Sequence, residues 1–191
     1  MTLSTATATP TTATPVSSTW NIDPAHSVAE FKVRHMMISY VRGEFSGLSG
    51  VLKLDEADYT RSTVEVSIPV ASVRTVDENL DTHLKNSDFF DVEKFPTLTF
   101  KSTDIRSVGD RDYVVTGDLT IHGTTKAVTL SVDGVSEPAN DPWGNQRIGL
   151  SGSAKVNRKD FGIVWNTALD SGGVLVGDEV KIALDVQFIK A

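Results

Sequence analysis

The chain has 191 residues, and its 18 lysines and arginines are outnumbered by 25 aspartates and glutamates, which gives a formal net charge of −7 at pH 7. A chain of this length is expected to form one compact domain, and one this acidic lacks the basic surface that supplies most of the affinity for nucleic acid. The absence of cysteine excludes disulfide bonds, a thiolate nucleophile and cysteine-ligated metal centres. No apolar run approaches the ~20 residues that a membrane-spanning helix needs, so we expect no membrane span.

The first nineteen residues differ in composition from the rest of the chain. Sixteen of them are Thr, Ala, Ser or Pro. Such a segment cannot bury enough apolar surface to become ordered, so we predict a disordered tail over 1–19 and a single folded domain over 20–191. The tail has neither the basic start nor the continuous apolar stretch of a secretory signal, which favours a cytoplasmic location.

From Trp20 onward the sequence is typical of β-structure. β-branched residues are frequent, and apolar residues alternate with polar ones, as in strands that have one buried and one solvated face. The alternation is clearest in five segments, at 63–70, 113–121, 127–133, 147–156 and 179–188.

Three further strands are predicted from less regular patterns. One covers 29–35 and another carries Leu98. In the third, the apolar phase switches between Phe45 and Leu48, which predicts a β-bulge near Ser46–Gly47. The total is eight strands, and their one-sided pattern indicates antiparallel pairing.

One segment is predicted to be helical. Thr75 and Glu78 have the spacing of a capping box, with Thr75 as the N-cap residue. Leu80 and Leu84 follow one helical turn apart on the same face. We expect this helical insert between the third and fourth strands, where its apolar residues and Phe89 cap one end of the sheet structure.

Eight strands of this kind can close into a barrel or fold into a two-layer sandwich. Closure is favoured because it removes exposed strand edges, and an eight-stranded barrel is wide enough to hold one small ligand. Small residues on the predicted inner faces favour a hollow interior, although glycines also relieve strain where barrel strands bend. These small residues are Ala29, Gly43, Gly117, Gly134, Gly152 and Ala154.

The four histidines show none of the local spacings of a metal site, so we expect neither a metal nor a cofactor. His35 continues the inner face of the first strand, where it either donates to a ligand head group or closes the strand with a hydrogen bond. Arg42 is expected near the same end, as a head-group anchor or as a solvated surface arginine. His83, on the predicted helix, is the third head-group candidate.

Distinctive blocks occur in order along the chain: WNIDPAHS at 20–27, FKVRH at 31–35, VRGEF at 41–45, HLKNSDFFDVEKFP at 83–96, GDLTIHGTTK at 117–126 and RKDFGI at 158–163. With these blocks the chain resembles the YceI-like family of lipocalin-like proteins, which are associated with binding polyisoprenoid and other long-chain lipids. The resemblance extends over about 20–190. It implies an antiparallel lipocalin-like barrel with a helical cap and a lipid in the lumen. Many members are exported, often to the periplasm, and some form dimers, so a periplasmic or secreted location and a homodimer stay open for this chain.

These observations predict non-catalytic binding of a long-chain isoprenoid or fatty-type lipid, or of a quinone-type molecule, inside the barrel. The nucleophile-elbow and nucleotide-binding motifs are missing. The alternatives are an enzyme that acts on a lipid-like substrate with His35 or His83 as general base, and a filled barrel that serves as an interaction module. The expected lumen contacts are Phe31, Val33, Phe45, Leu80, Leu84, Phe89, Phe100, Leu119, Ile121, Leu130, Leu150, Phe161, Trp165 and Leu184.

Overall fold

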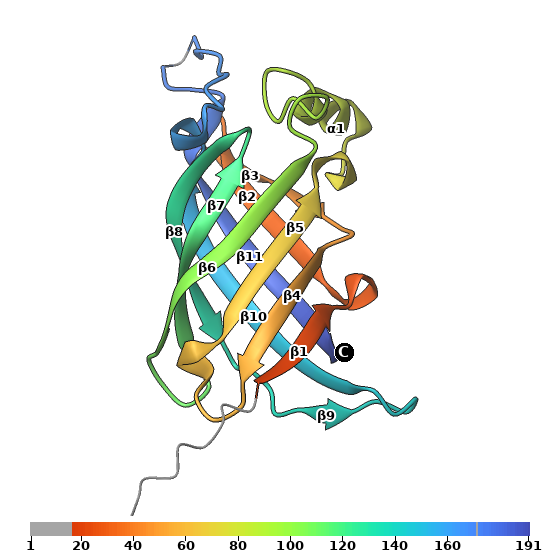
Figure 1. Ribbon diagram of the computed structural model, residues 1–191. Coiled ribbons are helices and arrows are strands. Elements are labelled where there is room, and N and C mark those ends of the chain that lie inside the picture. Colours follow the sequence, from red (N-terminus) through yellow and green to blue (C-terminus); the bar gives the residue numbers. More distant parts are fainter. Residues whose placement is uncertain (1–16, 171) are drawn as a thin grey trace, which may run out of the picture.

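The computed structural model describes residues 17–170 and 172–191, which form a closed β-barrel with one short helix at its rim (Figure 1). The tail predicted over 1–19 lies outside the described residues up to residue 16. Residues 17–19, however, belong to the first strand, so the predicted end of the tail is too late. The strands are β1 (Ser17–Ile22), β2 (Val28–His35), β3 (Ser39–Phe45), β4 (Ser49–Asp55), β5 (Thr63–Pro69), β6 (Thr97–Ser107), β7 (Tyr113–Ile121), β8 (Thr124–Asp133), β9 (Ala139–Asn140), β10 (Gln146–Asn157) and β11 (Val176–Lys190).

Eight of these strands form a closed ring in the order β11, β1, β4, β5, β6, β7, β8 and β10. The pairing of β10 with β11 closes the ring, and all the pairings in it are antiparallel. Strand β11 also pairs with β2, which in turn pairs with β3, so a β2–β3 hairpin extends the barrel wall at one end. The predicted eight-stranded antiparallel barrel is confirmed.

The strands are more divided than the sequence pattern predicted. The second predicted strand is split into β3 and β4, because residues 46–48 leave the ladder and Gly47 has a φ of 68°. The bulge expected near Ser46–Gly47 is therefore a full interruption. Strand β1 precedes the first predicted strand and is followed by a 3₁₀ turn, η1 (Pro24–His26). Because of these extra strands, helix α1 (Glu78–Lys85) lies between β5 and β6 and not between the third and fourth strands of the chain.

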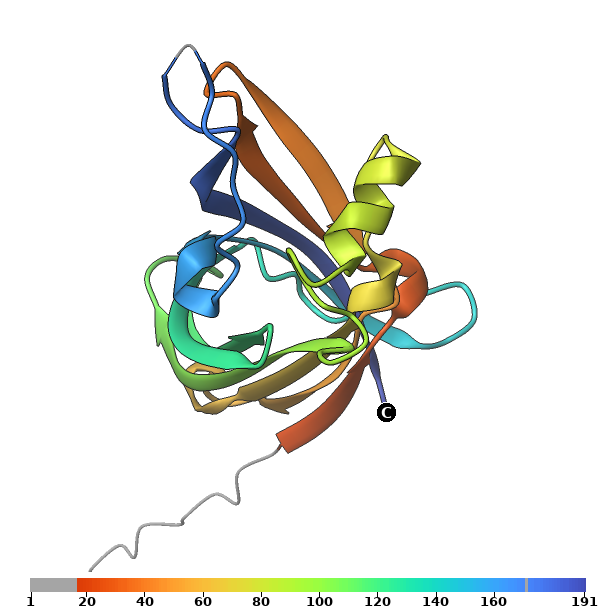
Figure 2. The same ribbon diagram turned by 90° about the horizontal axis from the view of Figure 1, so that it is seen from above.

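The start of α1 also differs from its prediction. The N-cap residue is Asp77, whose carboxylate accepts a hydrogen bond from the Asn79 N–H at 2.9 Å. The capping box with Thr75 as N-cap is wrong, because the N–H and the hydroxyl of Thr75 both donate to the Asp81 carboxylate, at 2.6 and 2.7 Å. These bonds tie the segment before the helix to the first helical turn, and they hold α1 at the rim of the barrel opening (Figure 2).

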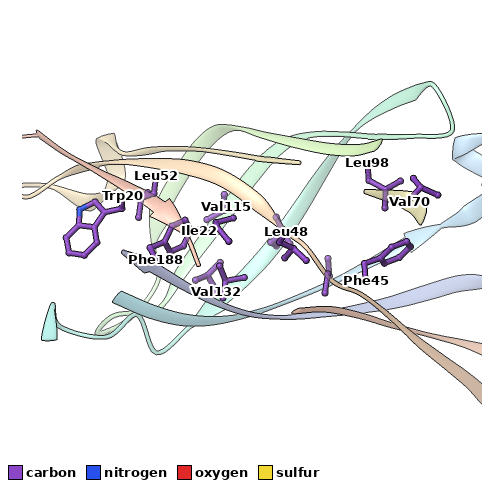
Figure 3. Packing of buried hydrophobic residues seen from close by; sticks show 14 of the residues in the cluster. Trp20, Ile22, Phe45, Leu48, Leu52, Val70, Leu98, Val115, Val132 and Phe188 are labelled. Atoms are coloured by element: carbon purple, nitrogen blue, oxygen red, sulfur yellow. The ribbon is translucent and has the colours of Figure 1, made fainter. Parts of the chain in front are cut away.

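The barrel is held together by apolar side chains that converge from opposite strands. Figure 3 shows Trp20, Phe188 and Val132 toward one end of this core and Phe45 and Leu98 toward the other. Each large side chain removed from water contributes about 1.5–3 kcal/mol to folding. The most completely buried residues are Trp20, Phe161, Leu48, Ile148, Val70 and Val73.

Two of the inner-face glycines do not create the space that was expected of them. A Cβ at Gly43 would overlap the ring of Phe31 on the paired strand β2, and one at Gly117 would overlap the ring of Phe100 on β6. The aromatic rings thus fill the volume that the glycines leave. Gly134 has a φ of 62° and follows the end of β8, so it is not an inner-face residue. The prediction that small residues hollow the barrel is wrong at these three positions.

An ion-pair network joins the β1–β2 connection to the turn between β9 and β10. Arg147 donates through Nη1 to Asp23 at 2.6 Å and through Nε to Asp141 at 2.8 Å. Asp23 also accepts from the Ala25 N–H and contacts the ring of His26. The Arg147 guanidinium, followed by His26, lowers the pKa of Asp23 to about 2, and Arg147 and then Asn145 lower the pKa of Asp141.

This network is expected to make the free energy of unfolding depend on pH in the acid range. A carboxyl whose pKa is lower in the folded chain stabilises the fold above its unfolded pKa near 3.8, and this contribution is lost as pH falls through 3.8 toward 2. For Asp23, with solvent screening allowed for, the contribution is about 1–2 kcal/mol. In urea unfolding at several pH values, R147M should lower stability at neutral pH and show a shallower loss in acid than the parent protein. R106M removes an exposed pair with Asp104 and should leave both unchanged; parallel acid profiles for R147M and the parent would contradict the prediction.

Candidate functional site

A cavity of about 570 Å³, here called the mouth cavity, opens between the β2–β3 hairpin and α1. His35 at the end of β2, Arg42 on β3 and His83 on α1 all line it. The structure thus brings together three polar residues that lie far apart in the sequence, at the end of the barrel where α1 stands (Figure 1). The other wall residues that were predicted as lumen contacts are Phe31, Val33, Leu80, Leu84, Phe89 and Trp165.

The mouth cavity also has wall residues that the sequence pattern did not indicate. Tyr40 and Val41 line it from β3, Asp77 from the start of α1, and Leu175 from the segment before β11. Their positions depend on how the hairpin, the helix and the C-terminal strand meet. No local spacing in the sequence could have pointed to them.

His83 is held by one polar and two aromatic neighbours. Its Nε2 lies 3.0 Å from a carboxylate oxygen of Asp88. Its ring meets the rings of Phe89 and Trp165 edge-on, with the ring centroids 5.0 Å apart in both cases. These contacts fix the orientation of the imidazole at the edge of the mouth cavity.

Below the mouth cavity, two smaller cavities of about 130 Å³ each lie inside the barrel. One of them, here called the upper lumen cavity, shares Phe31 with the mouth cavity, so these two cavities adjoin at that ring. The other is called the lower lumen cavity. The upper and lower lumen cavities share five wall residues, and most of the other residues around them are apolar. The shared residues are Val66, Phe100, Leu130, Leu184 and Val186.

The remaining predicted contacts separate into two groups. One group lines the lumen cavities. Phe161 does not line the mouth or either lumen cavity; it is buried in the 3₁₀ turn η4 (Arg158–Phe161) that follows β10. The lumen-lining residues are Phe45, Phe100, Leu119, Ile121, Leu130, Leu150 and Leu184.

Arg158 is a buried residue that holds the wall of the mouth cavity in place. Its side chain is 5% exposed, and its guanidinium donates to the carbonyl oxygens of Ile163 and Gly177 at 2.9 Å and of Trp165 at 2.8 Å. Its Nη2 lies 3.4 Å from a carboxylate oxygen of Asp178. Removal from water lowers the pKa of Arg158, and the Asp178 charge opposes this effect. The sequence pattern did not indicate this role, because the hydrogen-bond acceptors of Arg158 are backbone carbonyl oxygens, which every residue type has.

Within residues 17–170 and 172–191, no group of three His, Asp or Glu side chains is placed to hold a metal ion. Among the same residues, none of the helices has the length and apolar character needed to cross a membrane.

Comparison with known proteins agrees with this architecture. A UPF0312 protein of Pseudomonas paraeruginosa is 38% identical over 165 residues, which cover 86% of this chain and 82% of the relative. The crystal structure of BcnA from Burkholderia cenocepacia superposes with a TM-score of 0.75 at 27% identity, covering 87% of this chain and 98% of that one.

A third protein shares the fold at lower identity. A domain from Saccharophagus degradans, described as a polyisoprenoid binding domain, superposes with a TM-score of 0.64 at 15% identity, covering 90% of this chain and 98% of that one. A family model described as a YceI-like domain matches residues 20–188, which include nine of the eleven strands in full and parts of β1 and β11. The chain therefore belongs to the YceI-like family.

Proposed function

We propose that the protein binds one long-chain amphiphile, an isoprenoid or fatty-type lipid, with its hydrocarbon chain in the lumen cavities and its polar head group in the mouth cavity. The observation that carries this proposal is the succession of three adjoining cavities along the barrel. Polar side chains gather at the open end, and the inner cavities are largely apolar. This polarity gradient matches that of an amphiphile.

The energetics favour a chain-shaped ligand. Each methylene removed from water contributes about 0.8 kcal/mol, so a long chain offsets the loss of its own freedom without any polar contact in the lumen. Each lumen cavity has a volume of only about 130 Å³, which suits part of one extended chain better than a bulky ring system. The Saccharophagus domain, described as polyisoprenoid-binding, supports the proposal only in that it has the same fold.

The bound molecule can be identified directly. The purified protein should be denatured in organic solvent and the extract examined by mass spectrometry, with the solvent extract of the buffer as the blank. A long-chain lipid recovered in a fixed ratio to protein is the expected result. Failure to recover a lipid, together with failure of the purified protein to take up a fluorescent isoprenoid or fatty-acid probe, would overturn the proposal.

The head-group side chains are expected to raise the affinity for the lipid without changing the number of lipid molecules bound per protein. A hydrogen bond from a charged side chain to a ligand contributes about 1.5–3 kcal/mol, so R42Q should weaken binding of an anionic-head lipid about tenfold or more. H35Q should have a smaller effect, because the glutamine amide can replace the hydrogen bond that the imidazole would donate. Titration with a fluorescent fatty acid measures both, with R106Q on the distant end of β6 as the control. If R42Q and R106Q bind equally, the head group does not lie at Arg42.

A second candidate function is chemistry on the lipid head group, and the His83–Asp88 pair at 3.0 Å favours it. A histidine that is oriented by a carboxylate can act as a general base. In that case, incubation with the recovered lipid should yield a modified product, and H83Q should abolish its formation while the probe still binds. An unchanged lipid after prolonged incubation would contradict catalysis.

A further inference from the structure

The tip of the β2–β3 hairpin exposes three consecutive apolar residues. Met36, Met37 and Ile38 are 41%, 53% and 76% exposed, respectively. Met36 and Met37 also have positive φ angles of 50° and 61°, in the left-handed region that favours glycine or asparagine. The turn therefore keeps two large apolar side chains in water on a strained backbone, where Asn-Gly would be more stable.

This tip lies at the rim of the mouth cavity. The Met36 N–H donates to the Leu175 carbonyl oxygen at 2.7 Å, which joins the tip to the segment before β11. In that segment Val174 is also exposed. Figure 2 shows the two loops side by side on one edge of the opening, with α1 on another.

Behind the tip, a row of cations crosses the outer face of four neighbouring strands. Arg42 on the edge strand β3 borders both the mouth cavity and this outer face, and it is directly opposite Lys32 on β2. Lys32 is opposite Lys181 on β11, and Lys181 is opposite Lys155 on β10. Like charges in directly opposed positions destabilise a sheet, and here they occur four in a row in a chain of net charge −7. Of the four, only Lys155 reaches a carboxylate within 4.0 Å in the described part of the chain, that of Glu179.

Tyr40 draws these cations together beside the tip. The Arg34 guanidinium carbon lies 4.4 Å from the centroid of the Tyr40 ring, and the Lys181 and Lys32 ammonium groups lie at 5.6 and 5.7 Å. Each of these cations is attracted to the face of the Tyr40 ring, while the three positive charges repel one another. The same strands border an outer hollow of about 620 Å³, so the cations face an open surface.

We infer that this face docks onto the surface of an anionic lipid bilayer, with Met36, Met37 and Ile38 entering the interface and Lys32, Arg34 and Lys181 contacting lipid phosphates. An apolar tip followed by a basic belt has the charge and polarity profile of the head-group region of such a bilayer. Long lysine side chains can reach phosphates while the tip sits deeper.

The acidic side of the rim sets the orientation of this contact. Asp77, Glu78 and Asp81 lie on and before α1, across the mouth from the hairpin. Repulsion between these carboxylates and anionic lipid opposes an end-on contact. The barrel should therefore approach the bilayer with its hairpin side. The docking itself does not need a loaded lumen. Its role in moving lipid between the bilayer and the mouth cavity rests on the proposed function.

Vesicle sedimentation tests the docking with the protein as purified. Vesicles of phosphatidylcholine with phosphatidylglycerol should bind the protein, vesicles of phosphatidylcholine alone should bind it far less, and high salt should weaken binding. Each basic residue near an anionic surface contributes about a fivefold gain, so K32Q/K181Q should lose about twentyfold or more. The control pair K53Q/K101Q also removes two positive charges from the outer face, on β4 and β6, and should bind like the parent.

The apolar tip is tested separately. Because the chain has no cysteine, M37C carries a single site for an environment-sensitive fluorophore, and V108C places the same label on the exposed β6–β7 turn. Anionic vesicles should shift the emission at residue 37 to the blue and leave that at residue 108 unchanged. I38S should weaken vesicle binding, and circular dichroism would show that it still folds.

The docking is overturned if both vesicle types bind equally, if the two lysine pairs behave alike, or if the label at residue 37 does not shift. It is also overturned if analytical ultracentrifugation shows a dimer that I38S abolishes, because the tip would then be covered by a second copy. Vesicle binding without a lipid in the lumen would support the docking and contradict only the proposed function.

Discussion

Replacing Arg158 by alanine is expected to lower the free energy of unfolding by about 3–5 kcal/mol, the largest loss we predict for a single substitution in this chain. The guanidinium satisfies the carbonyl oxygens of Ile163, Trp165 and Gly177 within a buried space. Alanine leaves these acceptors without their donor and opens a cavity as well. Denaturant unfolding followed by tryptophan fluorescence measures the loss.

Two comparisons make the Arg158 result specific. R158K keeps the charge but cannot offer donors in several directions of one plane, so it should recover only part of the stability. K159A removes the neighbouring side chain, which is half exposed and pairs with Asp178 at 2.9 Å, and should change stability by less than about 1 kcal/mol. If R158A and K159A were equally stable, the buried hydrogen bonds of Arg158 would not hold this wall.

The second large effect concerns binding. Substitution of Leu184 by tryptophan should reduce the affinity for an isoprenoid probe at least about tenfold, because Leu184 lines both lumen cavities and the larger ring would occupy them. The free energy of unfolding should change by no more than about 1–3 kcal/mol, the usual range for overpacking. Fluorescence titration with the probe and denaturant unfolding measure the two quantities separately.

The matched control for L184W lies on the same strand. I189W places the same ring on β11 at a residue that pairs with Asn21 and Arg147, on the face opposite to Phe188, and should leave probe binding unchanged. A folded L184W protein that binds the probe with the affinity of the parent would place the hydrocarbon chain outside the lumen.

Some features of the barrel follow from local patterns. Alternation of apolar and polar residues predicted seven of the ring's strands, since burial of one face leaves a period of two in the sequence. Leu80 and Leu84 likewise predicted α1, although they did not identify its N-cap. Strand β1 was missed because only Trp20 and Ile22 on it are buried, which is too short a pattern to recognise.

Other features depend on contacts between distant segments and could not be predicted. The space left by Gly43 is filled by Phe31 only because β2 pairs with β3 in one register. Arg147 reaches Asp23 across 124 positions of the chain, and nothing near either residue indicates the other.

The sequence by itself therefore determined the antiparallel β-class, the helical insert and the polar residues that were candidates for a site, because each depends on periodicity or composition within a short segment. Only the tertiary structure decided that His35, Arg42 and His83 line one cavity and that Lys32, Lys181 and Lys155 form one row. The reason is geometric: barrel closure and strand register place residues from four or more separate segments side by side, and neither is written into any single segment.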